Sequence, residues 1–232
     1  MPIVTQIDYL QYGDMLAFIG NSLLKPMTQT QSVGLDPLFW KSLPDFGEDS
    51  IGEAVSLCEG IAEHIGRECG ERAVEVVSVE YTRLFVGPPS PAAPPWETMY
   101  RGSTNVGFGE ATFEMRNCLH DLGLELSNEN RQYEDHMGIE LLYLSELCRR
   151  TSKGNDWENQ ACSFIAKHPL SWVDAFLDRI EEVFPEGYFS GLVRLEKALL
   201  LACYETSKAP PGLCIGEMTY SKARWGRGIS LL

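Results

Sequence analysis

Apolar residues recur at intervals of three and four along most of this chain, which is the spacing of one face of an α-helix. The stretch from Val74 to Val79 is rich in β-branched residues, but its neighbours keep the helical interval. The pattern predicts helices over about 3–23, 51–65, 71–85, 108–122, 134–150, 156–167, 170–184 and 188–206. We therefore expect an all-α fold, a single compact helical bundle with no sheet.

Local signals predict several boundaries. Gly13 and Gly20 are weak points in the first helix, because glycine is a poor helix former. Ser50 has the spacing of a capping box with the glutamate three residues later, so we expect a helix to start there. Residues 25–47 should be mostly irregular, with the run Leu-Phe-Trp at 38–40 as an apolar anchor. Residues 207–232 have the composition of a loosely held tail, which leaves 1–206 as the helical domain.

The segment after the third predicted helix cannot be helical, because five of its eight residues from Pro88 to Pro95 are proline. Each proline fixes φ and removes an amide donor, so this proline strap should be stiff and extended and should lie against another part of the fold. Apolar side chains flank it on both sides, namely Tyr81, Leu84, Phe85, Trp96 and Tyr100. We interpret the arrangement as the wall of a groove. The alternative is that these aromatic residues are core and the strap is a surface crossing.

The formal net charge of −14 argues against a nucleic-acid partner, because phosphate binding needs a basic face. The Lys and Arg residues are scattered, and Arg149 and Arg150 form the only adjacent pair. An acidic surface would instead attract a basic peptide. Solubility is the alternative explanation of the charge.

Cofactor and metal motifs are missing from the sequence. It contains no phosphate-binding loop, no dinucleotide fingerprint and no nucleophile elbow, and its seven cysteines have no zinc spacing. The four histidines lie apart from one another, so we expect no metal and no cofactor. The odd cysteine count and the lack of a signal peptide or a membrane-spanning run predict reduced thiols in a cytoplasmic protein.

Asp135 and His136 are the best candidates for polar chemistry, because a carboxylate beside an imidazole can orient it and raise its pKa. Adjacent residues of a helix point apart, however. The structural alternative is that Asp135 caps the helix that follows or is a first-turn acid. On the sequence alone an acid–base pair, a helix cap and a binding site all remain open.

Two motifs resemble the TorD/DmsD family of cytoplasmic maturation chaperones of molybdenum-cofactor redox enzymes. The first is YTRLFVGP at 81–88 with PPWETMY at 94–100, and the second is EDHMGIELLYL at 134–144. Weaker similarity covers HPLSW at 168–172. The resemblance implies the all-helical fold that the periodicity also predicts. One departure lies before the second motif, where the family commonly has a proline and this chain has Tyr133.

The resemblance also implies a function and a site. The chain would bind the twin-arginine leader and the apo form of a molybdopterin oxidoreductase catalytic subunit, assist cofactor insertion and proofread before export. No covalent chemistry is needed. The implied leader-binding residues are Tyr81, Leu84, Phe85, Trp96, Tyr100, Asp135 and His136.

Two other functions stay open on the sequence: a helical scaffold without leader specificity, and an enzyme that uses Asp135 and His136 as acid and base. The chain could be a monomer or a homodimer that exchanges helical segments, with a hinge at 124–135. The sequence does not say which oxidoreductase is the client.

Overall fold

A computed structural model describes residues 8–101, 108–126, 132–153 and 158–206. Within these ranges the chain is helical and contains no strand, which confirms the all-α prediction. The α-helices are α1 (Tyr9–Leu24), α2 (Pro37–Lys41), α3 (Asp49–Cys69), α4 (Ala73–Tyr81), α5 (Thr98–Arg101), α6 (Glu110–Asp121), α7 (Met137–Ser152), α8 (Glu158–Lys167), α9 (Val173–Glu181) and α10 (Tyr188–Thr206).

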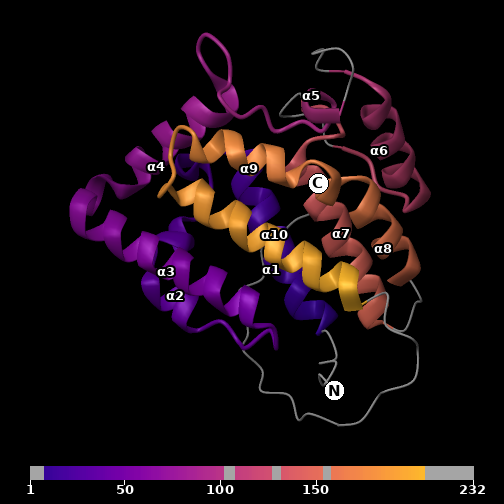
Figure 1. Cartoon of the computed structure of the whole chain (residues 1–232), viewed down its shortest axis with the longest axis horizontal. Helices are drawn as coiled ribbons and strands as arrows, with labels where there is room; N and C mark the ends of the chain where they lie inside the picture. Colours follow the sequence, from indigo (N-terminus) through magenta and orange to yellow (C-terminus); the bar gives the residue numbers. More distant parts are fainter. Residues whose placement is uncertain (1–7, 102–107, 127–131, 154–157, 207–232) are drawn as a thin grey trace.

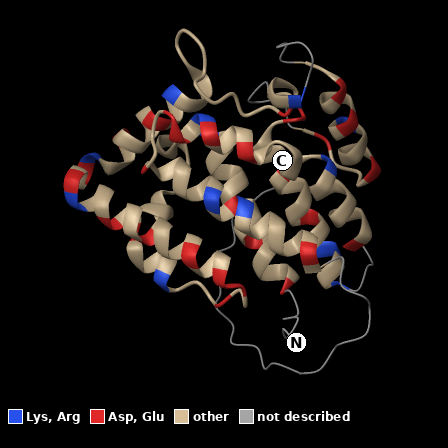
Figure 2. Ribbon diagram, viewed as in Figure 1, with Lys and Arg blue, Asp and Glu red and all other residues tan. Residues whose placement is uncertain are grey.

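Helix α10 crosses the face of the bundle that is turned to the viewer in Figure 1, between α3 on one side and α7 and α8 on the other. Its bounds agree with the predicted 188–206. Leu192, Leu195 and Leu199 are fully buried on it, so this helix supplies much of the core that joins the two sides. Acidic and basic residues are scattered over the visible helices (Figure 2). None of the described helices is both long and apolar enough to cross a membrane.

Helices α1 and α7 pack with their backbones in close contact. A Cβ atom added to Gly20 would lie 2.8 Å from the carbonyl oxygen of Gly138, and one added to Gly138 would lie 2.6 Å from the carbonyl oxygen of Gly20. Helix α1 runs unbroken through Gly13 and Gly20, which the sequence analysis marked as weak points. The absence of a side chain at Gly20 is what allows the two helices to approach.

Several helix starts differ from the predicted ones. Helix α3 starts at Asp49 after the N-cap residue Glu48, which makes no side-chain capping bond, so the predicted capping box at Ser50 is wrong. Helix α7 starts at Met137 rather than at 134, because His136 occupies the N-cap position. The capping residue of a helix has extended backbone angles, which periodicity alone does not reveal.

The region 25–47 is mostly irregular, as predicted, with 3₁₀ turns at Met27–Gln29 and Ser32–Leu35 before the short helix α2. Of the predicted anchor only Phe39 and Trp40 are buried, whereas the side chain of Leu38 is exposed. The indole of Trp40 donates a hydrogen bond to the carbonyl of Gly34.

The end of α4 and the proline strap form a hydrogen-bonded unit. A π-helical turn at Thr82–Val86 follows α4, and Gly87, with φ of 89°, ends it. The strap then turns back, and the amide of Ala93 donates to the carbonyl of Leu84 at 2.8 Å. Ala93, Pro94 and Pro95 are buried, so this end of the strap lies against the fold as predicted, whereas Pro88, Pro89 and Ser90 are exposed.

Four stretches that carry predictions lie wholly or partly outside the described residues. These are the start of the first helix at 3–7, part of the hinge at 127–131, the start of the predicted helix at 156 and the tail at 207–232.

Candidate functional site

The proline strap and the start of α7 are joined by main-chain hydrogen bonds. The amide of Met137 donates to the carbonyl of Pro95, and the amide of Glu97 donates to the carbonyl of Asp135, both at 2.9 Å. Between these bonds Trp96 and His136 form an isolated antiparallel β-bridge. The two sequence motifs are about 40 residues apart in the chain, and the fold brings them into one junction.

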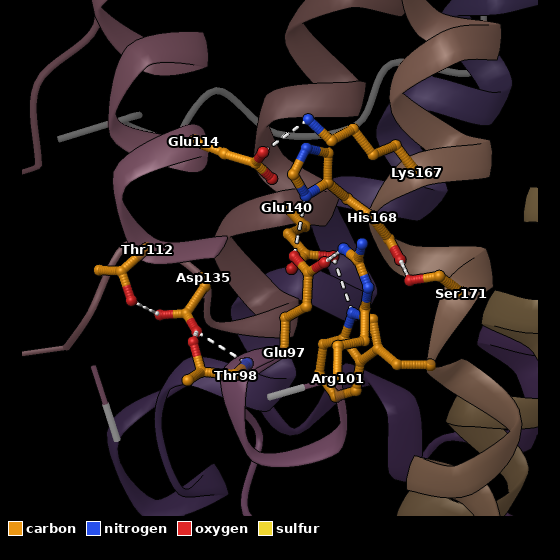
Figure 3. Close-up of polar contacts among 11 residues, drawn as sticks. Glu97, Thr98, Arg101, Thr112, Glu114, Asp135, Glu140, Lys167, His168 and Ser171 are labelled. Atoms are coloured by element: carbon orange, nitrogen blue, oxygen red, sulfur yellow. Dashed lines mark hydrogen bonds and ion pairs between the residues drawn. The ribbon is translucent and has the colours of Figure 1, made fainter. Parts of the chain in front are cut away.

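Asp135 binds two threonines in the interior of this junction (Figure 3). Its side chain is fully buried. One carboxylate oxygen accepts from the amide of Thr98 at 3.0 Å and from the hydroxyl of the same residue, and the other accepts from the hydroxyl of Thr112 at 2.9 Å. Asp135 therefore connects the start of α5, α6 and the start of α7. The interpretation of Asp135 as a helix cap is wrong, because His136 is the cap.

His136 closes the N-terminus of α7. Its Nδ1 accepts a hydrogen bond from the amide of Gly138 at 3.0 Å, so the neutral ring carries its proton on Nε2. Burial lowers the pKa of His136 to about 3. The ring edge lies against Trp96, with the centroids 5.9 Å apart. A neutral, capping imidazole and an aspartate that accepts three hydrogen bonds do not form an acid–base pair at neutral pH.

A buried polar cluster lies beside the junction and was not predicted. Glu97 is fully buried, and its carboxylate is shared between the guanidinium of Arg101 and Nδ1 of His168, which lies 2.8 Å away. Burial lowers the pKa of His168 to about 4, so the ion pair with Arg101 carries the charge. Figure 3 shows Glu97 between these two side chains.

Glu140 adds a second buried carboxyl group to this cluster. The indole of Trp172 donates to one of its oxygens at 3.3 Å. Burial and, next, the charge of Asp135 raise the pKa of Glu140 well above its usual value. A raised pKa favours the neutral form of the Glu140 carboxyl group. Glu140 therefore does not add a second uncompensated buried charge beside Asp135.

Sequence reasoning missed Glu97, Glu140 and His168. Glu97 lies two residues after the strap, in the motif PPWE, which is the one signal that could have drawn attention to it. His168 was interpreted as a helix terminus. It does precede a 3₁₀ turn at Pro169–Ser171, but its side chain is also buried against Glu97.

The predicted groove residues divide into buried and half-buried groups. Tyr81, Leu84 and Phe85 have at most 4% of their surface exposed, and Phe85 packs edge-on against Phe189 with a centroid distance of 5.0 Å. In this conformation their side chains are core.

Trp96 and Tyr100, after the strap, are only half-buried. Tyr100 stacks on Trp172 at 5.0 Å, and the guanidinium of Arg179 lies 4.7 Å from its ring centroid. Of the predicted set, only Trp96 and Tyr100 keep part of their surface exposed in this conformation.

The described residues contain no group of three or more His, Cys, Asp or Glu side chains that could hold a metal ion. The junction combines buried hydrogen bonds with two aromatic residues, Trp96 and Tyr100, that are partly exposed.

Comparison with known proteins gives one family. Residues 48–178 match the family model described as nitrate reductase delta subunit. The chain is similar to the Tat proofreading chaperone DmsD of Salmonella typhimurium, with 27% identity over 120 residues, which are 52% of this chain and 56% of that one. It is also similar to the chaperone protein TorD of Shewanella pealeana, with 23% identity over 184 residues, or 76% and 77% of the two chains.

The match to DmsD thus spans little more than half the length of that relative. A crystal structure of a redox enzyme maturation protein from Archaeoglobus fulgidus is 24% identical and covers 73% of this chain and 91% of its own, with a TM-score of 0.39.

Proposed function

The chain belongs to the nitrate reductase delta subunit family, which includes the TorD and DmsD chaperones, and from this premise we propose that it is a redox-enzyme maturation chaperone. In this proposal it works in the cytoplasm and binds the twin-arginine leader of a molybdopterin oxidoreductase catalytic subunit. It shields the leader until the cofactor is inserted and thereby proofreads before export. Its named relatives are chaperones rather than enzymes.

The observation that carries the proposal is the junction itself. The residues matched by the family model contain the proline strap, the Asp135–His136 pair and His168, and all three are connected by hydrogen bonds in the fold. Helical periodicity alone would not require hydrogen bonds between these three distant segments. Their presence supports a function located at the junction.

The chemistry of a twin-arginine leader fits the surface around the junction. Such a leader joins a basic segment to an apolar one, so it needs both negative charge and exposed apolar side chains in its receptor. The chain supplies an excess of 14 negative charges and the partly exposed rings of Trp96 and Tyr100. Binding of this kind requires no covalent step and no cofactor on the chaperone.

The predicted residues have different roles in this proposal. Asp135 and His136 are buried, so they position the strap and the start of α7 and do not contact the leader in this conformation. Tyr81 and Phe85 pack against Phe189 of α10, and Leu84 is fully buried. A peptide reaches these three side chains only if the elements that cover them move.

Co-purification tests the function directly. The tagged full-length chain is co-expressed with a molybdopterin oxidoreductase subunit that carries its twin-arginine leader and, separately, with the same subunit lacking the leader. The proposal predicts that the leader-bearing form is retained much more strongly. Equal retention of both forms would instead support a scaffold without leader specificity, and retention of neither would reject a client relationship with that subunit.

A further inference from the structure

Three exposed aromatic side chains contact one another next to the junction. Phe108 lies 4.9 Å from Phe113 and 5.7 Å from Tyr133 between ring centroids. Their exposed fractions are 41%, 50% and 43%, respectively. We call these three residues the aromatic patch. Phe113 lies on α6, Phe108 precedes α6, and Tyr133 precedes the Asp135–His136 pair.

The exposure of Phe108 is not what the sequence pattern indicates. Phe108 was predicted to lie on the apolar face of a helix over 108–122, but α6 starts at Glu110 and leaves Phe108 outside it. Burial of a phenylalanine side chain is worth about 1.5–3 kcal/mol. A cluster of aromatic rings that remains in water is therefore typical of a surface that a partner covers.

The patch already holds one guanidinium group. Cζ of Arg116 lies 5.6 Å from the ring centroid of Phe113, and Nε of Arg116 is 2.7 Å from the carboxylate of Glu134. An aromatic face with a carboxylate beside it is a suitable site for an arginine. Because half of the Arg116 side chain is exposed, an arginine from a partner can compete with it for the same groups.

Buried hydrogen bonds fix the patch to the junction. The amide of Gly109, next to Phe108, donates to the hydroxyl of Thr112 at 3.2 Å, and this hydroxyl donates to Asp135. On the other side, the carbonyl of Tyr133 accepts from the amide of His136 at 3.3 Å. The aromatic patch is thus held by hydrogen bonds to Asp135 and His136, the pair that the sequence analysis singled out.

The surroundings of the patch are acidic. Helix α6 carries Glu110, Glu114 and Asp121, with Arg116 as its only Lys or Arg residue, and Lys167 of α8 pairs with Glu114. Figure 2 shows acidic residues and one basic residue along this helix. A basic peptide is attracted to such a surface, and an acidic or uncharged one is not.

We propose that the aromatic patch with Glu134 is the surface that binds an arginine of the partner peptide together with the apolar residues beside it. This inference rests on the proposed function and places the leader contact on Phe108, Phe113, Tyr133 and Glu134, outside the residue set that the sequence implied. The apolar residues of the peptide cover the three rings, and its guanidinium takes the place of Arg116 between Phe113 and Glu134.

The test is calorimetric titration of the full-length chain with a twin-arginine leader peptide. Phe113→Ala and Tyr133→Ala should each weaken binding by about tenfold or more, as expected for aromatic anchors of an interface. Leu38→Ala is the matched control, because Leu38 is an exposed apolar residue on α2, with 69% of its surface exposed. It should leave the affinity unchanged.

A second pair of variants tests the exchange of guanidinium groups. Arg116→Met frees Phe113 and Glu134 and should strengthen binding of the arginine peptide. Lys41→Met removes the same charge far from the patch, where Lys41 pairs with Glu59 and Glu63, and should have a much smaller effect. A peptide with both arginines replaced by glutamine should not distinguish Arg116→Met from the wild type.

The outcomes separate the two proposals. Tight binding by the wild type that is unaffected at Phe113 and Tyr133 overturns the placement of the contact and leaves the proposed function intact. Absence of binding by the folded wild type overturns both. Concentration-dependent self-association that the same two variants abolish, without any change in peptide affinity, would identify the patch as an interface between two copies of the chain and overturn its role in peptide binding.

Discussion

The hydroxyl of Thr112 on α6 donates a hydrogen bond of 2.9 Å to the fully buried carboxylate of Asp135. This contact links α6 to the start of α7 across 23 residues of sequence. Removal of a donor from a buried carboxylate costs more than the hydrogen bond itself contributes, because the charge is left undersolvated.

Thr112→Val should therefore lower the free energy of unfolding by about 1–3 kcal/mol. Thr82→Val is the matched control, since Thr82 is exposed and its hydroxyl bonds only to the carbonyl of Ser78 one turn earlier. It should change stability by less than about 0.5 kcal/mol. Urea unfolding of both variants measures the difference, and equal effects would show that the Thr112–Asp135 bond contributes nothing specific.

Glu80 makes stability depend on pH near neutrality. Its carboxylate accepts from the amides of Tyr188 and Phe189 at the start of α10, yet burial raises its pKa from 4.5 to about 7. Between pH 4.5 and about pH 7 the Glu80 carboxyl group is therefore protonated in the folded state and ionised in the unfolded state. This contribution to stability is complete below about pH 4.5 and is lost as pH rises to about 7.

The Glu80→Gln variant does not titrate. The difference in unfolding free energy, wild type minus variant, should fall with pH between 5 and 7 by up to about 1.4 kcal/mol per pH unit, and level off at higher pH. Urea unfolding at several pH values measures it. A difference that is constant over this range contradicts the assignment.

His136 should have the opposite effect in acid. Its pKa falls from 6.5 to about 3 in the folded state, so stability is complete above about pH 6.5 and is lost as pH falls toward 3. His136→Asn keeps an N-cap side chain without the titration, so this variant should lose less stability than the wild type between pH 7 and 5.

His136→Ala separates the cap from the titration. It removes the side chain that accepts from the amide of Gly138 and should cost about 1 kcal/mol at pH 7. If Asn and Ala at position 136 have the same stability at pH 7, the capping role is refuted.

Gly20→Ala tests the contact between α1 and α7. The new Cβ atom would lie 2.8 Å from a backbone oxygen of α7, which cannot move without displacing the helix. The expected loss of stability is about 1–3 kcal/mol. Gly60→Ala, in the middle of α3 with no atom within 4 Å of its Cβ position, should instead be stabilising by about 0.5–1 kcal/mol. Thermal unfolding of the two variants distinguishes these opposite signs.

Periodicity and helix breakers were enough to predict the all-α class and the bounds of α10, because these depend on local spacing. They did not reveal Gly20 as a contact, since a close approach between two helices depends on residues more than 100 positions apart. The bond between Glu97 and His168 is equally non-local. The exposure of Phe108 was missed because α6 begins two residues later than the apolar pattern indicated.

The two motifs that the sequence analysis singled out lie together in the fold. The family motifs identified the strap and the Asp135–His136 pair, and the fold brings them together. The sequence left open whether Tyr81, Leu84 and Phe85 lie in the core or line a groove, because apolar residues at helical spacing occur in both, and the structure places them in the core. Their contact with a leader stays a prediction.

The most direct test of the central claim is titration of the full-length chain with a native twin-arginine leader peptide and with the same peptide after both arginines are replaced by glutamine. The account predicts micromolar or tighter binding of the native peptide, a loss of about tenfold or more on replacement, and weaker binding of the native peptide at high salt. Equal affinity for the two peptides, or no binding of either by the folded protein, would contradict it.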